Sequence, residues 1–236
     1  MTVSQKVAIV TGASQGIGAG LVQAFRDRDY RVIANSLSIG PSSDPGVLTI
    51  AGDVSAAETA ERIVGDGLRH FGRIDTLVNN AGIFIAKPFT DYTEADFAKM
   101  IATNLAGFFH VTQASIAPMI QQGSGHIVNI TASVADQPSS QHPSLLTSLT
   151  KGGLNAATTA LAIEFAAHGI RVNAVAPGTI KTPAHPAESY AGLEKLVPLG
   201  RLGDVEDIVN AVLFLESARF VSGEILYVDG ARSAGL

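Results

Sequence analysis

The chain has 236 residues, 46% of them hydrophobic and 16% charged, which excludes an intrinsically disordered protein and predicts one folded domain over residues 1–236. Its formal net charge is −5 and it has no basic cluster, which argues against binding to nucleic acid or to an anionic membrane. It has no cysteine, so disulfides, thiolate catalysis and zinc–thiolate sites are excluded, and we expect no metal site. The first residues lack the features of a signal peptide, and no apolar run reaches the roughly 18 residues of a membrane span, so we expect a cytoplasmic protein.

Short apolar runs alternate with longer segments of helical periodicity, which is the pattern of repeated βαβ units. Most runs are continuously apolar, as parallel strands covered by helices on both faces should be. The predicted fold is therefore α/β, a Rossmann-like, doubly wound and mostly parallel sheet with helices on both faces. The predicted strands are Val7–Val10, Val32–Ala34, Val47–Ile50, Thr76–Val78, Ile127–Ile130, Val172–Val175 and Ile225–Val228.

Three segments between these strands show an apolar helical face. Thr93 and Asp96 have the spacing of a capping box, so we expect the second of these helices to begin at Thr93 and to end near Pro118. The third is expected after Asp204. The positions expected to face the core are Ile17, Leu21, Val22 and Phe25 in the first helix, Phe97, Met100, Ile101, Leu105 and Phe108 in the second, and Ile208, Val209, Val212 and Leu215 in the third.

Two segments rich in proline and glycine interrupt this alternation. Ser36–Gly46 predicts a surface loop. Pro177–Arg201 holds four prolines and three glycines between a strand and the last helix. A loop of this length in a compact domain is more often functional than not, so we expect it to form part of a substrate site.

The first predicted strand leads directly into a glycine-rich turn and then a helix, the arrangement that binds the phosphates of a dinucleotide. The turn reads Thr11-Gly12-Ala13-Ser14-Gln15-Gly16-Ile17-Gly18. Gly12 permits the tight turn, while Gly16 and Gly18 let the backbone approach a pyrophosphate at the start of the helix. There the free N–H groups and the helix dipole favour negative charge. A tight turn without a ligand is the alternative interpretation.

This turn resembles that of the short-chain dehydrogenases/reductases, Thr-Gly-x-x-x-Gly-x-Gly, and the resemblance extends over nearly the whole chain. Further matches are Asp53-Val54, Asn79-Asn80-Ala81-Gly82, Asn104, Ser133, Lys151 and Pro177-Gly178-Thr179-Ile180-Lys181-Thr182. The resemblance implies that Asp53 contacts the adenine and that Ile180 and Thr182 hold the nicotinamide carboxamide. The cofactor-binding residues that it implies are Gly12, Ser14, Gln15, Gly16, Ile17, Gly18, Ser36, Asp53, Val54, Asn80, Ala81, Gly82, Lys151, Pro177, Gly178, Ile180 and Thr182.

The choice between the two nicotinamide cofactors depends on the end of the second strand. An acidic residue there would bind the adenosine ribose and repel a 2′-phosphate. Ser36 occupies the expected position, and no Asp or Glu lies between Asp29 and Asp44. Gln15 stands where many NADP-preferring relatives carry arginine. We expect NADP(H) to be slightly favoured and NAD(H) to be used as well.

The catalytic residues match the family with one gap. In the family, a tyrosine four residues before the lysine supplies the proton, a serine holds the carbonyl oxygen, and a helix asparagine orders water behind the lysine. By resemblance, Ser133, Lys151 and Asn104 take three of these roles, but the tyrosine position is Thr147. A threonine hydroxyl is too weak an acid to replace the phenol. His142, five residues before Thr147, is a candidate proton donor because a histidine titrates near neutral pH.

Several interpretations remain open at this stage. The chain is predicted to be an oxidoreductase in which Ser133 and Lys151, together with either His142 or water, replace the tyrosine. It could instead be an oxidoreductase that reduces an imine or another activated electrophile, which needs no strong protein acid. The alternatives outside catalysis are a nicotinamide-binding protein that serves as a redox sensor or a partner surface and, as the weakest option, a structural protein with vestigial motifs. Of the other histidines, His110 is expected in packing and His185 in the substrate loop.

The substrate and the oligomeric state are less constrained. The substrate pocket is expected between Thr131–Leu146 and Pro183–Leu196, where Ala184, Ala187, Ala191 and Leu193 indicate a small, mostly apolar molecule. The predicted helix Leu145–Ala167 carries small residues that allow close helix approach: Gly152, Gly153, Ala156, Ala157 and Ala160. Relatives use this helix for dimer contacts, so we expect a homodimer or homotetramer. Packing of the same residues on the protein's own sheet is the alternative.

Overall fold

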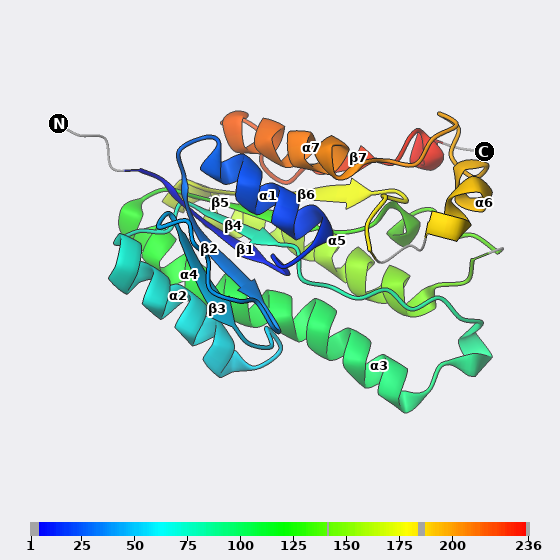
Figure 1. Ribbon diagram of the computed structural model, residues 1–236, viewed down its shortest axis with the longest axis horizontal. Helices are drawn as coiled ribbons and strands as arrows, with labels where there is room; N and C mark the ends of the chain where they lie inside the picture. Colours follow the sequence, from blue (N-terminus) through cyan, green and yellow to red (C-terminus); the bar gives the residue numbers. More distant parts are fainter. Residues whose placement is uncertain (1–4, 141, 184–186, 235–236) are drawn as a thin grey trace.

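The computed structural model describes residues 5–140, 142–183 and 187–234, and its centre is a parallel sheet of seven strands (Figure 1). The order of the strands across the sheet is β3-β2-β1-β4-β5-β6-β7, so the chain winds outward from β1 in one direction and from β4 in the other. This confirms the predicted doubly wound, Rossmann-like α/β fold. The strands are β1 (Val7–Thr11), β2 (Arg31–Ser36), β3 (Val47–Ala51), β4 (Thr76–Asn79), β5 (Gly125–Ile130), β6 (Ile170–Pro177) and β7 (Ile225–Val228).

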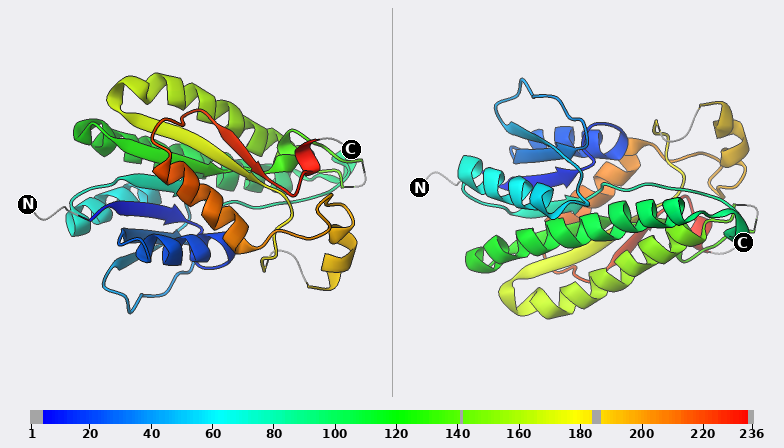
Figure 2. Two further views of the ribbon diagram at one scale, coloured as in Figure 1. Left: turned by 90° about the horizontal axis from the view of Figure 1, so that it is seen from above. Right: turned by 90° about the horizontal axis from the view of Figure 1, so that it is seen from below.

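Helices cover both faces of the sheet, as Figure 2 shows from opposite sides. One face carries α1 and α7, and the other carries α2, α4 and α5. Each layer has its own hydrophobic core, and β1 is buried along its whole length because it contributes side chains to both. The helices are α1 (Gly16–Arg26), α2 (Ala57–Phe71), α3 (Glu94–Met100), α4 (Gly107–Gln122), α5 (Leu145–Phe165), α6 (Tyr190–Glu194) and α7 (Val205–Ser217). Among the described residues, no helix is both long enough and apolar enough to cross a lipid bilayer.

The predicted strands and two of the three predicted helical faces are confirmed. All seven strands occur where expected, and β6 extends two residues further at each end than Val172–Val175. In α1, Leu21 and Phe25 are fully buried. All four expected positions of α7 are buried against the sheet. The predicted helix faces therefore point at the core because apolar residues recur with helical periodicity.

The helix predicted from Thr93 begins as expected but is not regular. The Thr93 hydroxyl accepts the backbone N–H of Asp96, and the Asp96 carboxylate accepts the backbone N–H of Thr93, which completes the capping box. Between α3 and α4 the backbone is π-helical over Ile101–Ala106. Of the predicted stripe only Met100 is buried: Phe97 is 42% exposed, and Ile101, Leu105 and Phe108 are half-buried, so the stripe is wrong at those positions. The wider turn instead buries Asn104.

The two predicted irregular segments also differ in detail from the expectation. The surface loop begins after Ser36, because Ser36 itself is the last residue of β2. The segment predicted as a long loop over Pro177–Arg201 starts inside β6 and contains the short helix α6. Near its start, Ile180 forms an isolated parallel bridge with Gly203, which follows the segment, and this bridge lies outside the seven strands.

Candidate active site

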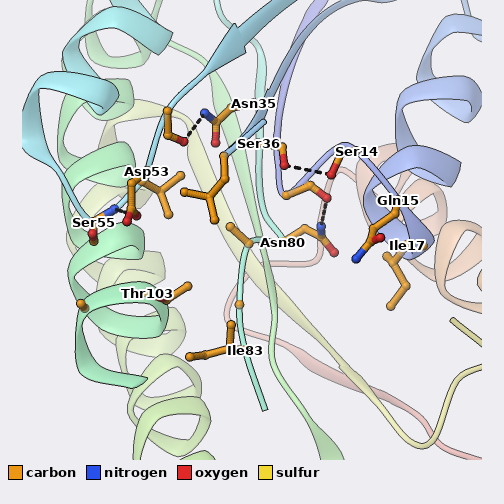
Figure 3. Close-up of a pocket in the computed structure, with 18 of the residues that line it drawn as sticks. Ser14, Gln15, Ile17, Asn35, Ser36, Asp53, Ser55, Asn80, Ile83 and Thr103 are labelled. Atoms are coloured by element: carbon orange, nitrogen blue, oxygen red, sulfur yellow. Dashed lines mark hydrogen bonds between the residues drawn. The ribbon is translucent and has the colours of Figure 1, made fainter. Parts of the chain in front are cut away.

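A groove of about 510 Å³ lies at the carboxyl ends of the central strands, where the strand order reverses between β1 and β4. Open parallel sheets bind ligands at this position because the flanking loops diverge there. Figure 3 shows the groove with side chains from the end of β2, the segment after β4 and the turn before α1 along it. It is lined by Gly12, Ser14, Gln15, Gly16, Ile17, Asn35, Ser36, Leu37, Gly52, Asp53, Val54, Ser55, Asn80, Ala81, Gly82, Ile83, Lys99, Ala102, Thr103, Thr182 and Pro183.

The glycine-rich turn forms one wall of the groove. Gly12 has a φ of +64°, which disfavours a residue with a side chain, and a Cβ on it would lie 2.9 Å from the Cα of Ala81. A Cβ on Gly18 would lie 2.1 Å from the carbonyl oxygen of Gly12. The glycines therefore let the turn fold tightly against α1 and β4, and α1 begins at Gly16 with its N-terminal N–H groups at the groove.

The floor of the groove is a hydrogen-bonded junction between β1 and β4. The Asn80 side chain donates to the carbonyl oxygens of Thr11 at 2.9 Å and Gly12 at 3.1 Å. The Thr11 hydroxyl accepts the backbone N–H groups of Asn80 and Ala81, both at 3.0 Å. Asn80 was predicted to bind the cofactor, and its side-chain amide holds the phosphate turn.

The adenosine end of the groove is uncharged at the position that distinguishes the two cofactors. Ser36 at the end of β2 shares a hydrogen bond of 2.9 Å with Ser14 of the turn, as drawn in Figure 3. Next to it, the buried Asn35 donates to the carbonyl oxygens of Ile50 and Gly52, and its own side-chain oxygen has no partner. Asn35 lines the groove and was not predicted, because an asparagine inside an apolar strand gives no functional signal by itself.

One acidic and one basic side chain line the groove among the described residues, Asp53 and Lys99. Asp53 and Val54 line it as predicted, and the Asp53 carboxylate accepts the backbone N–H of Ser55 at 2.9 Å. Lys99 and Thr103, from α3 and the π-helical segment, also line it, and no local pattern in the sequence predicts this. Lys99 is the only cation among the described residues that line the groove.

The predicted lysine and asparagine meet behind Gly82. A Cβ on Gly82 would lie 3.0 Å from Nζ of Lys151 and 3.3 Å from Oδ1 of Asn104. Nζ of Lys151 donates to the carbonyl oxygen of Ile130 at 2.7 Å. Burial lowers the pKa of Lys151 to about 8, because the charged ammonium group is less well solvated there than in water. The site therefore holds a buried amine whose proton is labile near neutral pH.

Asn104 fixes the segment that follows β4. Its side chain accepts the backbone N–H of Ile83 at 2.9 Å and donates to the carbonyl oxygen of the same residue at 3.0 Å. It also donates to the hydroxyl of Thr150, the neighbour of Lys151 on α5, at 3.1 Å. The π-helical segment carries Asn104 into this position, so the irregular turn joins α5 to the floor of the groove.

The remaining catalytic candidates differ in burial. Ser133 is buried in the short 3-10 turn Ser133–Ala135, directly after β5. Thr147 is 1% exposed, and its hydroxyl has no hydrogen-bond partner in the part of the chain that the structure describes. His142 is exposed in the segment between that turn and α5. The structure thus packs Ser133 and Thr147 into the interior and leaves the imidazole of His142 at the surface.

Of the residues from Pro177 to Thr182 that were predicted to bind the cofactor, only Thr182 lines the groove. Thr182 lines the groove near Gly16, where a Cβ on that glycine would lie 3.3 Å from the Thr182 side chain. Gly178 donates its N–H to Val228, and the Ile180 side chain is buried in the core, so neither lines the groove. Pro177 is the last residue of β6, and His185, with Ala184, lies outside the described residues.

Comparison with known proteins assigns this architecture to a family. A family model described as enoyl-(acyl carrier protein) reductase matches residues 12–231. The chain is 38% identical to an uncharacterized oxidoreductase of Methylorubrum extorquens over 95% of this chain and 96% of that protein. It is 34% identical to the 3-oxoacyl-[acyl-carrier-protein] reductase FabG of Thermotoga maritima, over 98% of each chain. The chain belongs to the short-chain dehydrogenase/reductase family.

Solved structures of short-chain dehydrogenases/reductases share its whole fold. The structure of ElxO with NADP bound has a TM-score of 0.91 at 30% identity, over 98% of this chain and 100% of that one. A 3-ketoacyl-(acyl-carrier-protein) reductase from Brucella melitensis, complexed with NADH, has a TM-score of 0.90 at 30% identity, over 97% and 98% of the chains. The family assigns the chain to the NAD(P)-dependent oxidoreductases.

The groove fits a dinucleotide on its own geometry. The space beside Gly12 and Gly18 has no room for side chains, so backbone lines the wall at the start of α1. The unpartnered oxygen of Asn35 and the neutral Ser14–Ser36 pair offer hydrogen bonds at the other end. Residues of the phosphate turn would hold the diphosphate, Asp53 and Val54 the adenosine, and Lys151 the nicotinamide ribose.

Proposed function

We propose that this protein uses NADP(H), with NAD(H) as a second cofactor, on a small and mostly apolar carbonyl, alcohol or imine compound. The observation that carries the proposal is the cluster of Lys151 and Asn104 directly behind Gly82 at the groove. Burying the ammonium group of Lys151 costs stability, which a purely structural protein would have no reason to bear. Next to a bound cofactor, the same group can bind the ribose and stabilise negative charge that develops in the reaction. The exposed Phe84 and Phe89, which follow Gly82 along the chain, support an apolar substrate.

The residues of the site divide the reaction between them. A bound nicotinamide cofactor supplies or accepts the hydride. Ser133 is proposed to hold the substrate oxygen, and Thr147 is proposed to occupy the place of the usual tyrosine. Among the described tyrosines, Tyr30, Tyr92 and Tyr227 donate their hydroxyls to Glu216, the carbonyl of Ile85 and Asp136. These three phenols are therefore bound elsewhere.

The proton in this proposal comes from Lys151. Its ammonium group uses one N–H for the Ile130 carbonyl, and burial lowers its pKa to about 8, close to the range in which a general acid is most effective. In reduction, Nζ gives one proton to the oxygen or nitrogen of the substrate, and solvent returns a proton to the amine. His142 is a weaker candidate because its side chain is exposed.

The cofactor preference follows from the neutral end of β2. Ser36 and Ser14 do not repel a 2′-phosphate, and Lys99 adds a positive charge to the groove. We therefore expect NADPH to bind in the micromolar range and at least as tightly as NADH, with a difference of no more than about tenfold, or roughly 1.4 kcal/mol.

The proposal is tested by titration calorimetry with both cofactors, followed by a cofactor-consumption screen over ketones, alcohols and cyclic imines. We expect both cofactors to bind and at least one substrate class to be turned over. If neither cofactor binds, the proposed function is overturned. Binding without turnover would favour a non-catalytic nicotinamide-binding protein, the alternative that the missing phenol at Thr147 supports.

We also propose that the protein forms a homodimer or homotetramer through α5. The outer face of this helix is apolar and unpartnered among the described residues: Leu145, Leu149, Ala156, Ala160 and Ile163 are exposed on it, and no atom lies within 4 Å of a Cβ built on Gly152. Burial of such a face stabilises association. Sedimentation velocity should show an oligomer that Ile163→Glu dissociates. Gly40→Glu, which adds the same charge in the open loop after β2, should leave the oligomer intact.

A further inference from the structure

The carboxylate of Asp136 connects the two elements that carry the proposed catalytic residues. Asp136 follows the 3-10 turn Ser133–Ala135, and its Oδ2 accepts the side-chain N–H of Asn155 on α5 at 2.8 Å. The same oxygen accepts the hydroxyl of Tyr227 on β7 at 2.5 Å. Asn155 lies one helical turn after Lys151, and both are buried on the same side of α5. One acidic side chain thus ties the Ser133 turn to the Lys151 helix and to the last strand.

The backbone of the turn transmits this connection to Ser133. The N–H of Asp136 donates to the carbonyl oxygen of Ser133 at 3.2 Å, and the N–H of Gln137 donates to the same oxygen at 3.1 Å. On the other side, the Ser148 hydroxyl of α5 donates to the carbonyl oxygen of Val134 at 3.1 Å. A displacement of Asp136 would therefore move the Ser133 carbonyl directly, while Ser148 holds only the middle of the turn.

The hydrogen bond between Tyr227 and Asp136 is the shortest contact of the group, at 2.5 Å. The hydrogen bond to Asp136, with a further contribution from burial, raises the pKa of Tyr227 to about 12. Asn155 adds a donor from the protein interior, and its own oxygen is buried without a partner. Among the residues that the structure describes, the Asn155 side chain is thus held only by its bond to Asp136.

We propose that Asp136, Tyr227 and Asn155 are positioning residues that set the placement of Ser133 relative to Lys151. This inference rests on the proposed function, because Ser133 and Lys151 act together only if the protein is an oxidoreductase. Positioning residues of this kind affect the rate because small errors in the placement of reacting groups are costly. They leave cofactor binding unchanged, since none of the three lines the groove.

The decisive variant is Tyr227→Phe, which removes one hydroxyl and keeps the ring. We expect kcat for the best substrate found in the screen to fall by about tenfold, the Kd of NADPH to stay the same, and amide hydrogen exchange over residues 133–137 to become faster. The matched control is Tyr30→Phe, because Tyr30 also donates its hydroxyl to a carboxylate, that of Glu216, at 2.7 Å. The control should lower global stability without changing kcat or exchange in the Ser133 turn.

A second variant keeps the proposal falsifiable if activity is absent. Asp136→Asn should move the pKa of Tyr227 down from about 12 toward its ordinary value of 10, which ultraviolet titration of the tyrosines can follow. This variant should also speed exchange over residues 133–137. Unchanged exchange in both variants would overturn the positioning role whatever the enzyme does. Failure of the wild-type protein to turn over any substrate would instead overturn the proposed function.

Discussion

Thr147 is a buried residue whose hydroxyl has no partner, at the position where relatives carry the proton-donating phenol. Thr147→Tyr would place a phenol one helical turn before Lys151, on the same face of α5. General acid catalysis typically contributes about 10²–10⁴-fold. We therefore expect the reduction of a simple ketone to rise by tens-fold or more, and the reduction of a cyclic imine to stay unchanged.

This change is measured as the initial rate of NADPH oxidation with one ketone and one cyclic imine. Thr147→Phe is the matched control, because it adds the ring without the hydroxyl and should not gain activity. A folded Thr147→Tyr variant that binds NADPH but shows no gain with the ketone would contradict the placement of Thr147 beside the reacting oxygen.

Lys151 connects burial with the pH dependence of the reaction. Burial lowers its pKa to about 8, so the ammonium form that donates a proton is lost as the pH rises through 8. We expect kcat/KM for reduction to fall on the alkaline side of this pH. Lys151→Arg keeps its proton throughout the range, so the small turnover that remains in this variant should show no alkaline limb.

Two substitutions at Lys151 distinguish the role of its positive charge in binding from its role as a proton donor. Lys151→Ala should raise the Kd of the cofactor and abolish turnover, whereas Lys151→Arg should lose turnover more than binding. The measurements are calorimetry with NADPH and pH–rate profiles from pH 6 to about 10. Wild-type turnover by Lys151→Ala would show that α5 does not cover the nicotinamide.

At the scale of one element, the end of β2 controls the choice of cofactor. Ser36→Asp would place a carboxylate beside Ser14, where it repels a 2′-phosphate and accepts hydrogen bonds from ribose hydroxyls. We expect the Kd of NADPH to rise by tenfold or more, about 1.4 kcal/mol, and that of NADH to fall or stay the same. Calorimetry measures both. Ser36→Asn is the neutral control and should leave the ratio near its wild-type value.

The elements also show where sequence reasoning succeeds. The strands, the glycine turn and the faces of α1 and α7 could be predicted because each depends on a local pattern of apolar residues or glycines. The face of the helix after Thr93 could not, because six residues from Ile101 to Ala106 adopt a wider turn that no local residue pattern indicates. The wider turn buries Asn104, which reaches Ile83 and Thr150.

The residues of the site could likewise be predicted only where a local motif identifies them. Asn104 and Lys151 could be placed by resemblance, and the structure brings them together behind Gly82. Asn35 and Asp136 could not be found, because their roles arise from contacts between segments far apart in the chain. The Asp136–Tyr227 bond, for example, joins residues 91 positions apart, and neither residue type is unusual in its local sequence.

At the scale of the whole molecule, a buried polar network joins the amino ends of the strands, opposite the groove. Glu216 at the end of α7 accepts hydrogen bonds from Tyr30 at 2.7 Å and Thr76 at 3.0 Å, and contacts Nδ1 of His126 at 2.7 Å. Lys6 adds an ion pair at 3.1 Å. Burial opposes ionisation of Glu216, but its bonds with His126 and Tyr30 outweigh it and lower the pKa to about 2.

The network predicts a specific loss of stability in acid. A carboxyl group with a pKa of 4.5 in the unfolded chain and about 2 in the folded one stabilises the fold above pH 4.5, and this contribution is lost as the pH falls from 4.5 to 2. The linked free energy of unfolding is about 3 kcal/mol. Urea unfolding of Glu216→Gln should show a deficit of about 3 kcal/mol at pH 7 that shrinks below pH 4.5. An equal deficit at pH 7 and pH 3 would contradict the ionised state of Glu216.

The pairing of β1 with β4 has a consequence for how the newly made chain acquires its ligand. Ala8 pairs with Thr76, and the bonds from Asn80 to Thr11 and Gly12 form only when these strands meet. A nascent chain that has emerged as far as β3 contains the whole glycine turn but none of the floor that holds it. We therefore expect affinity for the nucleotide only once β4 has left the ribosome, and we expect Lys151 to join the site later still, when α5 docks. A cofactor present during synthesis should then bind only these late intermediates and stabilise them by mass action.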